Sequence, residues 1–242
     1  MPGLTATLAR RALEQRVADR QSAYETEVER FVAAAYRLIE RTGGVDPSLR
    51  DLLAEAGLST QAFYRFFKSK DEFMLVLLDD GRRKLLGYLE HRMAAETTPS
   101  AKVRAWIEGV LAQASNPEAA ARTRPFVANR DRLSEAFPRE QQESVDLLVE
   151  LLLDPVTHLQ RTGDRRVAPR QLESARHDAE AVYTLVVGTL EAHLARRTRP
   201  TAQEVQDLVG FALRALGASP AAPRNAARRR APAPKRAKRR TT

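Results

Sequence analysis

The fold is decided by one stretch, SLRDLLAEAGLSTQAFYRFF, which spans residues 48–67. Ser48 can cap a helix with inward-facing leucines, and Gly57 permits the positive φ that a tight exit from this helix requires. Ser59 can cap the next helix by accepting hydrogen bonds from its free N–H groups. A helix, a short turn and a second short helix are typical of a helix-turn-helix. We therefore predict a DNA-reading element in this stretch.

The second helix of this motif has two different faces. At about 100° per residue, one side gathers Ala62, Phe63, Phe66 and Phe67, and we expect this side to be core. The other side carries Thr60, Gln61, Tyr64, Arg65 and Lys68. The Thr, Gln, Tyr and Arg side chains on it can reach base edges or phosphates. For Tyr64 and Arg65 an ordinary solvated face is the alternative.

Helical periodicity continues on both sides of the motif. Apolar residues at 3,4 spacing predict a helix from Val28 to Ile39 that Gly43 and Gly44 end. Ser69 or Asp71 is expected to start a helix that runs to about Ala95. Further helices are expected at about residues 100–115, 117–136, 139–162, 170–198 and 201–217, one of which Pro155 could kink or divide. The sequence predicts an all-α fold.

Composition divides the chain into four regions. We expect a polar, Arg-rich arm over residues 1–23, a helix-turn-helix domain over 24–72, a larger helical domain over 73–217 and a disordered basic tail over 218–242. The tail holds nine Lys and Arg residues and no Asp or Glu, so the other 31 basic residues balance the 31 acidic ones. The net charge of +9 therefore belongs to the tail. DNA phosphates are one partner for it; acidic protein, anionic membrane and RNA are others.

Several functional classes find no support in the residues. The chain has no cysteine, which removes disulfides, thiolate nucleophiles and Cys-ligated zinc. We find no HExxH pair, no Gly-rich phosphate loop and no GxSxG elbow. No apolar run is long enough for a signal peptide or a membrane span. We expect a soluble cytoplasmic protein that is not an enzyme and holds no cofactor or metal.

Residues 56–73, AGLSTQAFYRFFKSKDEF, resemble the recognition segment of the tetracycline-repressor (TetR) family of bacterial transcription regulators. The close resemblance covers about residues 28–80; beyond them only the helical layout and the length agree. Carried over by position, it implies three roles in DNA binding: Thr60, Gln61 and Ala62 nearest the floor of the major groove, Tyr64, Arg65 and Lys70 on phosphates, and Ser48 and Arg50 at the backbone and the groove wall. Many relatives have Gly or Pro in place of Gln61 and Thr in place of Ala62, so the operator sequence does not transfer.

The resemblance also implies that the larger domain dimerises and encloses a small-molecule pocket, whose ligand changes the spacing of the two DNA-reading heads. The pocket candidates are Trp106, Phe126, His158 and Tyr183, for which a place in the core is the alternative. Two apolar stripes are candidates for pairing with a second copy, with the protein's own core as the alternative: Ala179, Val182, Tyr183, Val186 and Leu190, and then Val205, Leu208, Val209, Ala212, Leu213 and Leu216.

Together these features predict a homodimeric regulator of transcription in the bacterial cytoplasm, associated with the nucleoid when bound to DNA. It would be a repressor that a small, largely apolar effector releases from a palindromic double-stranded operator. One alternative is an architectural or non-specific DNA-binding protein dominated by the basic tail, without an effector. Another is a helical enzyme or lipid carrier that has kept a regulator's scaffold.

Overall fold

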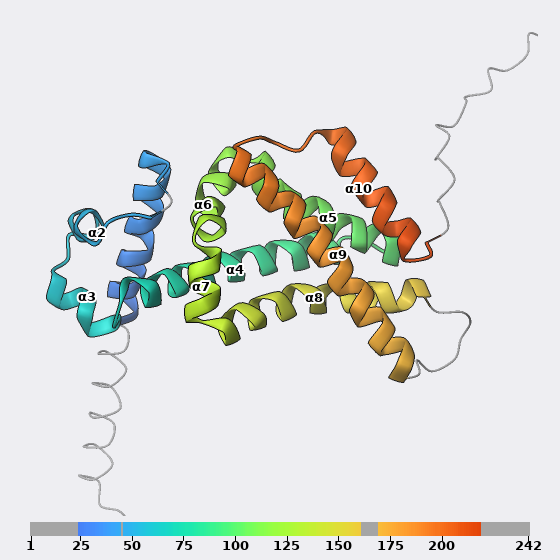
Figure 1. Ribbon diagram of the computed structural model, residues 1–242, viewed down its shortest axis with the longest axis horizontal. Coiled ribbons are helices and arrows are strands. Elements are labelled where there is room, and N and C mark those ends of the chain that lie inside the picture. Colours follow the sequence, from blue (N-terminus) through green and yellow to red (C-terminus); the bar gives the residue numbers. More distant parts are fainter. Residues whose placement is uncertain (1–23, 45, 161–168, 219–242) are drawn as a thin grey trace, which may run out of the picture.

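The computed structural model describes residues 24–44, 46–160 and 169–218, and all regular secondary structure in these ranges is helical (Figure 1). The predicted all-α fold is confirmed, while the predicted arm over residues 1–23 and all but residue 218 of the predicted tail lie outside the described residues. The helices are residues 24–42, α2 (Leu49–Ala56), α3 (Thr60–Phe66), α4 (Lys70–Ala94), α5 (Pro99–Ser115), α6 (Pro117–Ala128), α7 (Arg130–Ala136), α8 (Pro138–Gln160), α9 (Pro169–Arg196) and α10 (Ala202–Ala215). None of these helices is long and apolar enough to span a membrane.

Side-chain caps set the ends of the first helices. The hydroxyls of Ser48, Ser59 and Ser69 each accept a hydrogen bond from the backbone N–H three residues later, at 3.1 Å. Gly57 ends α2 in the left-handed conformation, with φ 62° and ψ 38°. Each serine cap contributes about 1 kcal/mol relative to alanine. The three caps and the glycine exit predicted from the sequence are confirmed.

Aromatic rings form the centre of the N-terminal core. Phe31, from the helix over residues 24–42, packs edge-to-face on Phe63 and Phe67 of the α3 region at centroid distances of 5.5 and 5.8 Å. Phe73 of α4 closes the cluster, 5.1 Å from Phe67. Such ring pairs contribute about 0.5–1.5 kcal/mol each beyond the burial of their area. The predicted aromatic face of α3 therefore holds the N-terminal core together. We call residues 24–77 the head.

A second core surrounds α5, which contacts α4, α6, α8, α9 and α10. Its largest member is Trp106, whose side chain is fully buried. Helices α4 and α5 approach closely at Gly109, where an added Cβ would lie only 2.5 Å from Leu89 Cδ2. The larger domain thus packs around one central helix.

The predicted helix over residues 117–136 is wrong, because the structure has two helices there, α6 and α7. They meet at Asn129, whose backbone N–H and side-chain amide both donate to the carbonyl of Pro125, at 3.1 and 2.7 Å. An Asn side chain competes with the backbone for such carbonyls and so favours a helix end. Pro155, in contrast, lies inside α8 without dividing it.

Helices α6 and α7 join the larger domain to the head, and Figure 1 shows them beside the helix over residues 24–42. Leu133 of α7 is 1% exposed and belongs to the apolar core of the head, against which Phe126 of α6 also packs. Arg122 of α6 pairs with Glu40 at 2.6 Å, and Arg132 of α7 pairs with Asp71 at 3.2 Å. The two parts of the chain are therefore packed together and not merely linked.

Candidate functional site

The polar face of α3 is open to solvent. Thr60, Gln61 and Tyr64 are exposed, and Tyr64 is 57% exposed. The rings of Tyr64 and Phe63 are in edge-to-face contact, with 5.4 Å between their centroids. Ala62 is half-buried and packs against the head core. The structure thus brings together on one short helix the three polar side chains that the sequence placed there.

Two of the expected phosphate ligands are ion-paired within the protein. Arg65 pairs with Glu27, and its guanidinium lies 4.9 Å from the centre of the Phe66 ring. Lys70 pairs with Asp46 at 2.7 Å. Exposed pairs of this kind contribute only about 0–1 kcal/mol. A phosphate could therefore replace the carboxylate at either cation with little loss of stability.

Two further cations flank the polar face of α3. Arg50 on α2 and Lys68 just beyond α3 are exposed, and neither has an ion-pair partner within the described part of the chain. Arg50 was predicted from the family resemblance. Lys68 was not assigned a role, although the helical wheel places it one turn after Tyr64 on the same face. Ser48 is also exposed, with its hydroxyl donating to Asp51 at 2.6 Å.

Charged side chains hold α2 against the helix over residues 24–42. Arg37 and Arg41 both pair with Glu55, at 2.9 and 2.8 Å. The hydrogen bond from Arg37 is the main reason why the pKa of the Glu55 carboxyl lies below its usual value. Arg30 donates to the carbonyl of Ala56 at 3.0 Å, where α2 ends. These bonds fix α2, and through the Gly57 turn they fix the orientation of α3.

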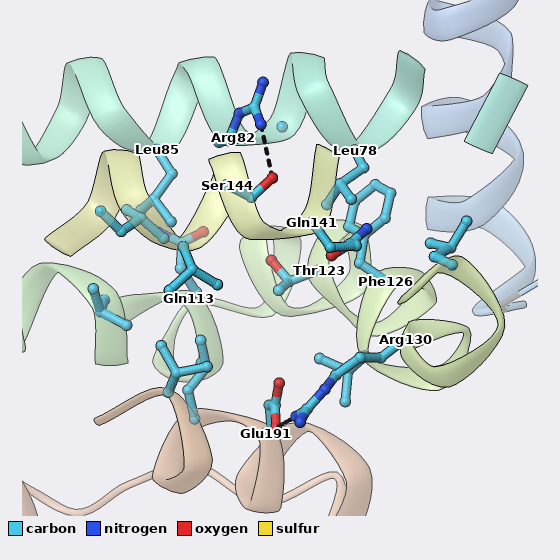
Figure 2. A pocket seen from close by; sticks show the side chains of 18 of the residues that line it. Leu78, Arg82, Leu85, Gln113, Thr123, Phe126, Arg130, Gln141, Ser144 and Glu191 are labelled. Carbon is cyan, nitrogen blue, oxygen red and sulfur yellow. Dashed lines mark hydrogen bonds and ion pairs between the residues drawn. The ribbon is translucent and has the colours of Figure 1, made fainter. Parts of the chain in front are cut away.

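A cavity of about 840 Å³ lies in the larger domain, between α4, α5, α6, α8 and α9 (Figure 2). Its volume falls within the range of about 300–1,000 Å³ that small-molecule sites occupy. Apolar side chains form most of the wall, among them Leu78, Leu85, Val110, Val127 and Leu148. Thr184 and Gly188 on α9 line the cavity and are exposed, so it opens to the surface there.

Two of the four pocket candidates, Phe126 and Tyr183, line this cavity. Trp106 lies in the core behind it, with its ring 6.5 Å from that of Tyr183. His158 is exposed near the end of α8, where its ring nitrogen lies 2.9 Å from the carbonyl of Asp154. The sequence did not single out the polar wall residues Arg82, Gln113 and Gln141, because they come from three different helices.

The cavity also touches the head. Tyr36 and Leu133 line it and belong to the head core at the same time. The hydroxyl of Tyr36 donates to the carbonyl of Leu77 at 3.4 Å, and burial is the main cause that raises its pKa far above the usual value. Arg122, another wall residue, lies 5.4 Å from the centre of the Tyr36 ring. A ligand in the cavity would therefore contact the head directly.

The apolar stripes predicted on the last two helices face the protein's own core. Their buried members include Ala179, Val186, Val209 and Ala212, each at most 1% exposed. The predicted helical period is confirmed, but the surface that these residues cover belongs to the same chain. The outer faces carry Leu185 on α9, 37% exposed, and Phe211 on α10, 56% exposed.

Residues 31–77 match the sequence model of a family described as bacterial regulatory proteins, tetR family. In structure the chain is similar to a TetR transcription regulator from Haloarcula marismortui ATCC 43049, with a TM-score of 0.57 and 17% identity over 80% of this chain and 98% of that chain. It is also similar to a TetR family regulator from Marinobacter aquaeolei VT8, with a TM-score of 0.52 and 16% identity over 81% and 97% of the two chains. No curated protein sequence matches the chain. The resemblance to the TetR family seen in the sequence is supported by both the head and the fold.

Proposed function

Starting from a TetR-like fold whose head matches the family's own sequence model, we propose that the protein is a homodimeric, ligand-responsive regulator of transcription. One observation carries this proposal: α3 exposes a row of hydrogen-bonding side chains on a helix-turn-helix whose opposite face is closed by aromatic packing. Such a helix fits the major groove of DNA. It would act in the cytoplasm as a repressor that stays bound to operator DNA until its ligand releases it.

In this proposal Gln61 and Thr60 read base edges, with Gln61 suited to adenine. Ala62 allows close approach to the groove floor. Tyr64, Arg50 and Lys68 hold phosphates, and Arg65 and Lys70 join them by exchanging their carboxylate partners for phosphate. Ser48 and the N-terminus of α2 contact the backbone on the other side of the groove.

Selection of bound DNA from a random pool, using the full chain without added ligand, tests the reading head. We expect an enriched palindrome. Gln61→Ala and Tyr64→Ala should each weaken binding to it by about tenfold or more, since a hydrogen bond to a base or a phosphate is lost. Tyr88→Ala is the matched control, because Tyr88 is an exposed tyrosine on α4, 39% exposed and outside the head. Equal binding of all sequences would contradict the proposal and favour a non-specific DNA-binding protein.

For the dimer we propose the outer faces of α9 and α10. Phe211 and Leu185 are large apolar side chains exposed to solvent, and the small residue Ala181, one turn before Leu185 on α9, would let a partner helix approach closely. Phe211→Glu should shift the protein from dimer to monomer in sedimentation velocity. The matched control is Leu147→Glu on α8, which is 44% exposed. A dimer that survives Phe211→Glu would contradict this assignment.

Coupling between ligand and DNA would run through α6 and α7. The salt bridge between Arg122 and Glu40 ties α6 to the first helix, while Phe126 and Leu133 pack on both the cavity and the head core. A ligand that binds better when α6 and α7 are displaced must lower the affinity of the head for its operator, because the two equilibria are linked.

A further inference from the structure

The carboxylate of Asp46 pairs with cations from both the head and the larger domain. Its Oδ1 atom lies 2.7 Å from Nζ of Lys70, at the start of α4, and 3.6 Å from Nη2 of Arg132, on α7. Arg132 also pairs through Nε with Asp71 of α4, at 3.2 Å. Two basic and two acidic side chains therefore meet where α7 packs on the head, and their formal charges cancel.

The two cations of this group come from parts of the chain with different roles. Lys70 belongs to the head and is one of the cations that the proposed function places on a DNA phosphate. Arg132 belongs to α7, on which Arg130, Leu133 and Ser134 line the cavity. At about 100° per residue, Arg132 lies on the opposite side of α7 from these three wall residues.

Helix α7 is held in place by contacts on both of its sides. With only seven residues it would be marginal as an isolated helix, so its position depends on its neighbours. Leu133 is buried in the core of the head, and Arg130 pairs with Glu191 of α9, as Figure 2 shows. A ligand that moves α7 from the cavity side would therefore also change the contact between Arg132 and Asp46.

The position of Arg132 decides how much negative charge DNA would meet beside Lys70. When Lys70 moves to a phosphate, Asp46 keeps Arg132 as a second cation, so its carboxylate does not stand unpaired beside the DNA backbone. Without Arg132 the group consists of Lys70 and two carboxylates, and its formal charge falls from zero to −1. The four side chains are 30–41% exposed, so solvent screens the effect, which should be severalfold at most.

We propose that Arg132 is a positioning residue for DNA binding: it neutralises Asp46 and so leaves Lys70 free to bind a DNA phosphate, an effect that is lost when α7 is displaced from the head. This inference rests on the proposed function, because it takes Lys70 to be a phosphate contact. It adds the charged groups through which a ligand in the cavity would weaken that contact. Ligand and DNA then disfavour each other, as linked binding equilibria require.

Charge-removing variants of the full-length protein test the proposal, with binding to duplex DNA followed by fluorescence anisotropy at several salt concentrations. The DNA is the enriched palindrome, or a mixed-sequence duplex if no sequence is enriched, because a phosphate contact does not depend on sequence. Lys70→Gln should weaken binding and reduce the salt slope by about one. Arg132→Gln should weaken binding about three- to fivefold, whereas Asp46→Asn should strengthen it by a similar factor.

The double variant separates this electrostatic role from a merely structural one. In an Asp46→Asn background, Arg132→Gln should change the affinity by less than about 1.5-fold, because the carboxylate through which it acts is absent. A direct phosphate contact by Arg132 would keep its full effect in that background. Loss of packing between α7 and the head would make Asp46→Asn weaken DNA binding as well.

Two further variants serve as controls. Arg132→Lys keeps the positive charge and should bind DNA within about twofold of the parent protein. Arg176→Gln is the matched control, because Arg176 on α9 is also 41% exposed and is paired with carboxylates, that of Asp146 at 3.3 Å among them. It should leave the DNA affinity unchanged, and circular dichroism checks the fold of every variant.

An effect of Arg132→Gln that persists undiminished in the Asp46→Asn background, or an Asp46→Asn variant that binds more weakly than the parent, would overturn the proposal. An unchanged salt slope in Lys70→Gln would overturn it too, because Lys70 then contacts no phosphate. Each of these results leaves the regulator function standing if a palindrome is enriched. If none is enriched but the variants behave as expected on mixed-sequence DNA, the sequence-specific regulator fails and the role of Arg132 stands. A protein that binds no duplex DNA would overturn both.

Discussion

Gly57 sets the angle at which α3 leaves α2, and replacing it by alanine gives a sharp test of this turn. The residue has φ 62° and ψ 38°, a left-handed conformation in which a Cβ crowds the following carbonyl oxygen. The nearest atom of another residue to an added Cβ is Arg30 Nη2, at 3.7 Å, which is ordinary van der Waals contact. The destabilisation is therefore conformational, and we expect about 1–2 kcal/mol.

Two companion variants separate this conformational effect from other causes. Gly57→Asn should lose less stability than Gly57→Ala, because asparagine enters the left-handed region more readily. Gly87→Ala in α4 should gain about 0.5–1 kcal/mol, because Gly87 lies inside a helix and an added Cβ there meets no atom within 4 Å.

Urea unfolding followed by circular dichroism, at one fixed protein concentration, measures all three variants. In thermal unfolding each 1 kcal/mol corresponds to a shift of roughly 2–4 °C for a chain of this size. The reasoning is refuted if Gly57→Ala is as stable as the parent protein, or if Gly57→Asn is the less stable of the two.

Two further changes test other contacts. Gly109→Ala should destabilise the protein by about 1–3 kcal/mol in calorimetry, because the new Cβ would lie 2.5 Å from Leu89 Cδ2 in a tightly packed core; an unchanged melting temperature would contradict this. Glu55→Gln should lower stability at neutral pH. Arg37 holds the pKa of Glu55 below its ordinary value of 4.5, so the contribution of the ionised carboxylate is complete above that pH and is lost as the pH falls through the folded-state value. Unfolding curves of the two proteins should therefore converge in acid, and a difference that persists there would count against the pairing.

Features that depend on a few neighbouring residues could be predicted from the sequence. The serine caps at Ser48, Ser59 and Ser69 and the left-handed exit at Gly57 arise from bonds within one turn of the chain. The two faces of α3 follow from helical geometry in the same way. This local chemistry is enough to recognise the reading head.

Features that depend on distant partners could not be predicted. Trp106 and Tyr183 looked alike in the sequence, and only the packing of α5 against α9 puts one in the core and the other in the cavity wall. The polar wall residues Arg82 and Gln141 come to the cavity from α4 and α8, 59 positions apart in the chain. The apolar period of α9 and α10 shows that a face is covered, but not which chain covers it.

The packing of Leu133 has a consequence for how such a protein can be taken apart or recombined. A fragment that stops at residue 72 would lack Phe73, Met74 and Leu77 of α4 as well as Leu133 of α7, all of them buried among the phenylalanines of the head. In this fragment α3 would pack on an apolar surface that is exposed to solvent. A head moved onto a different helical domain must therefore bring the first turns of α4 with it and find, on its new neighbour, a side chain that fills the place of Leu133.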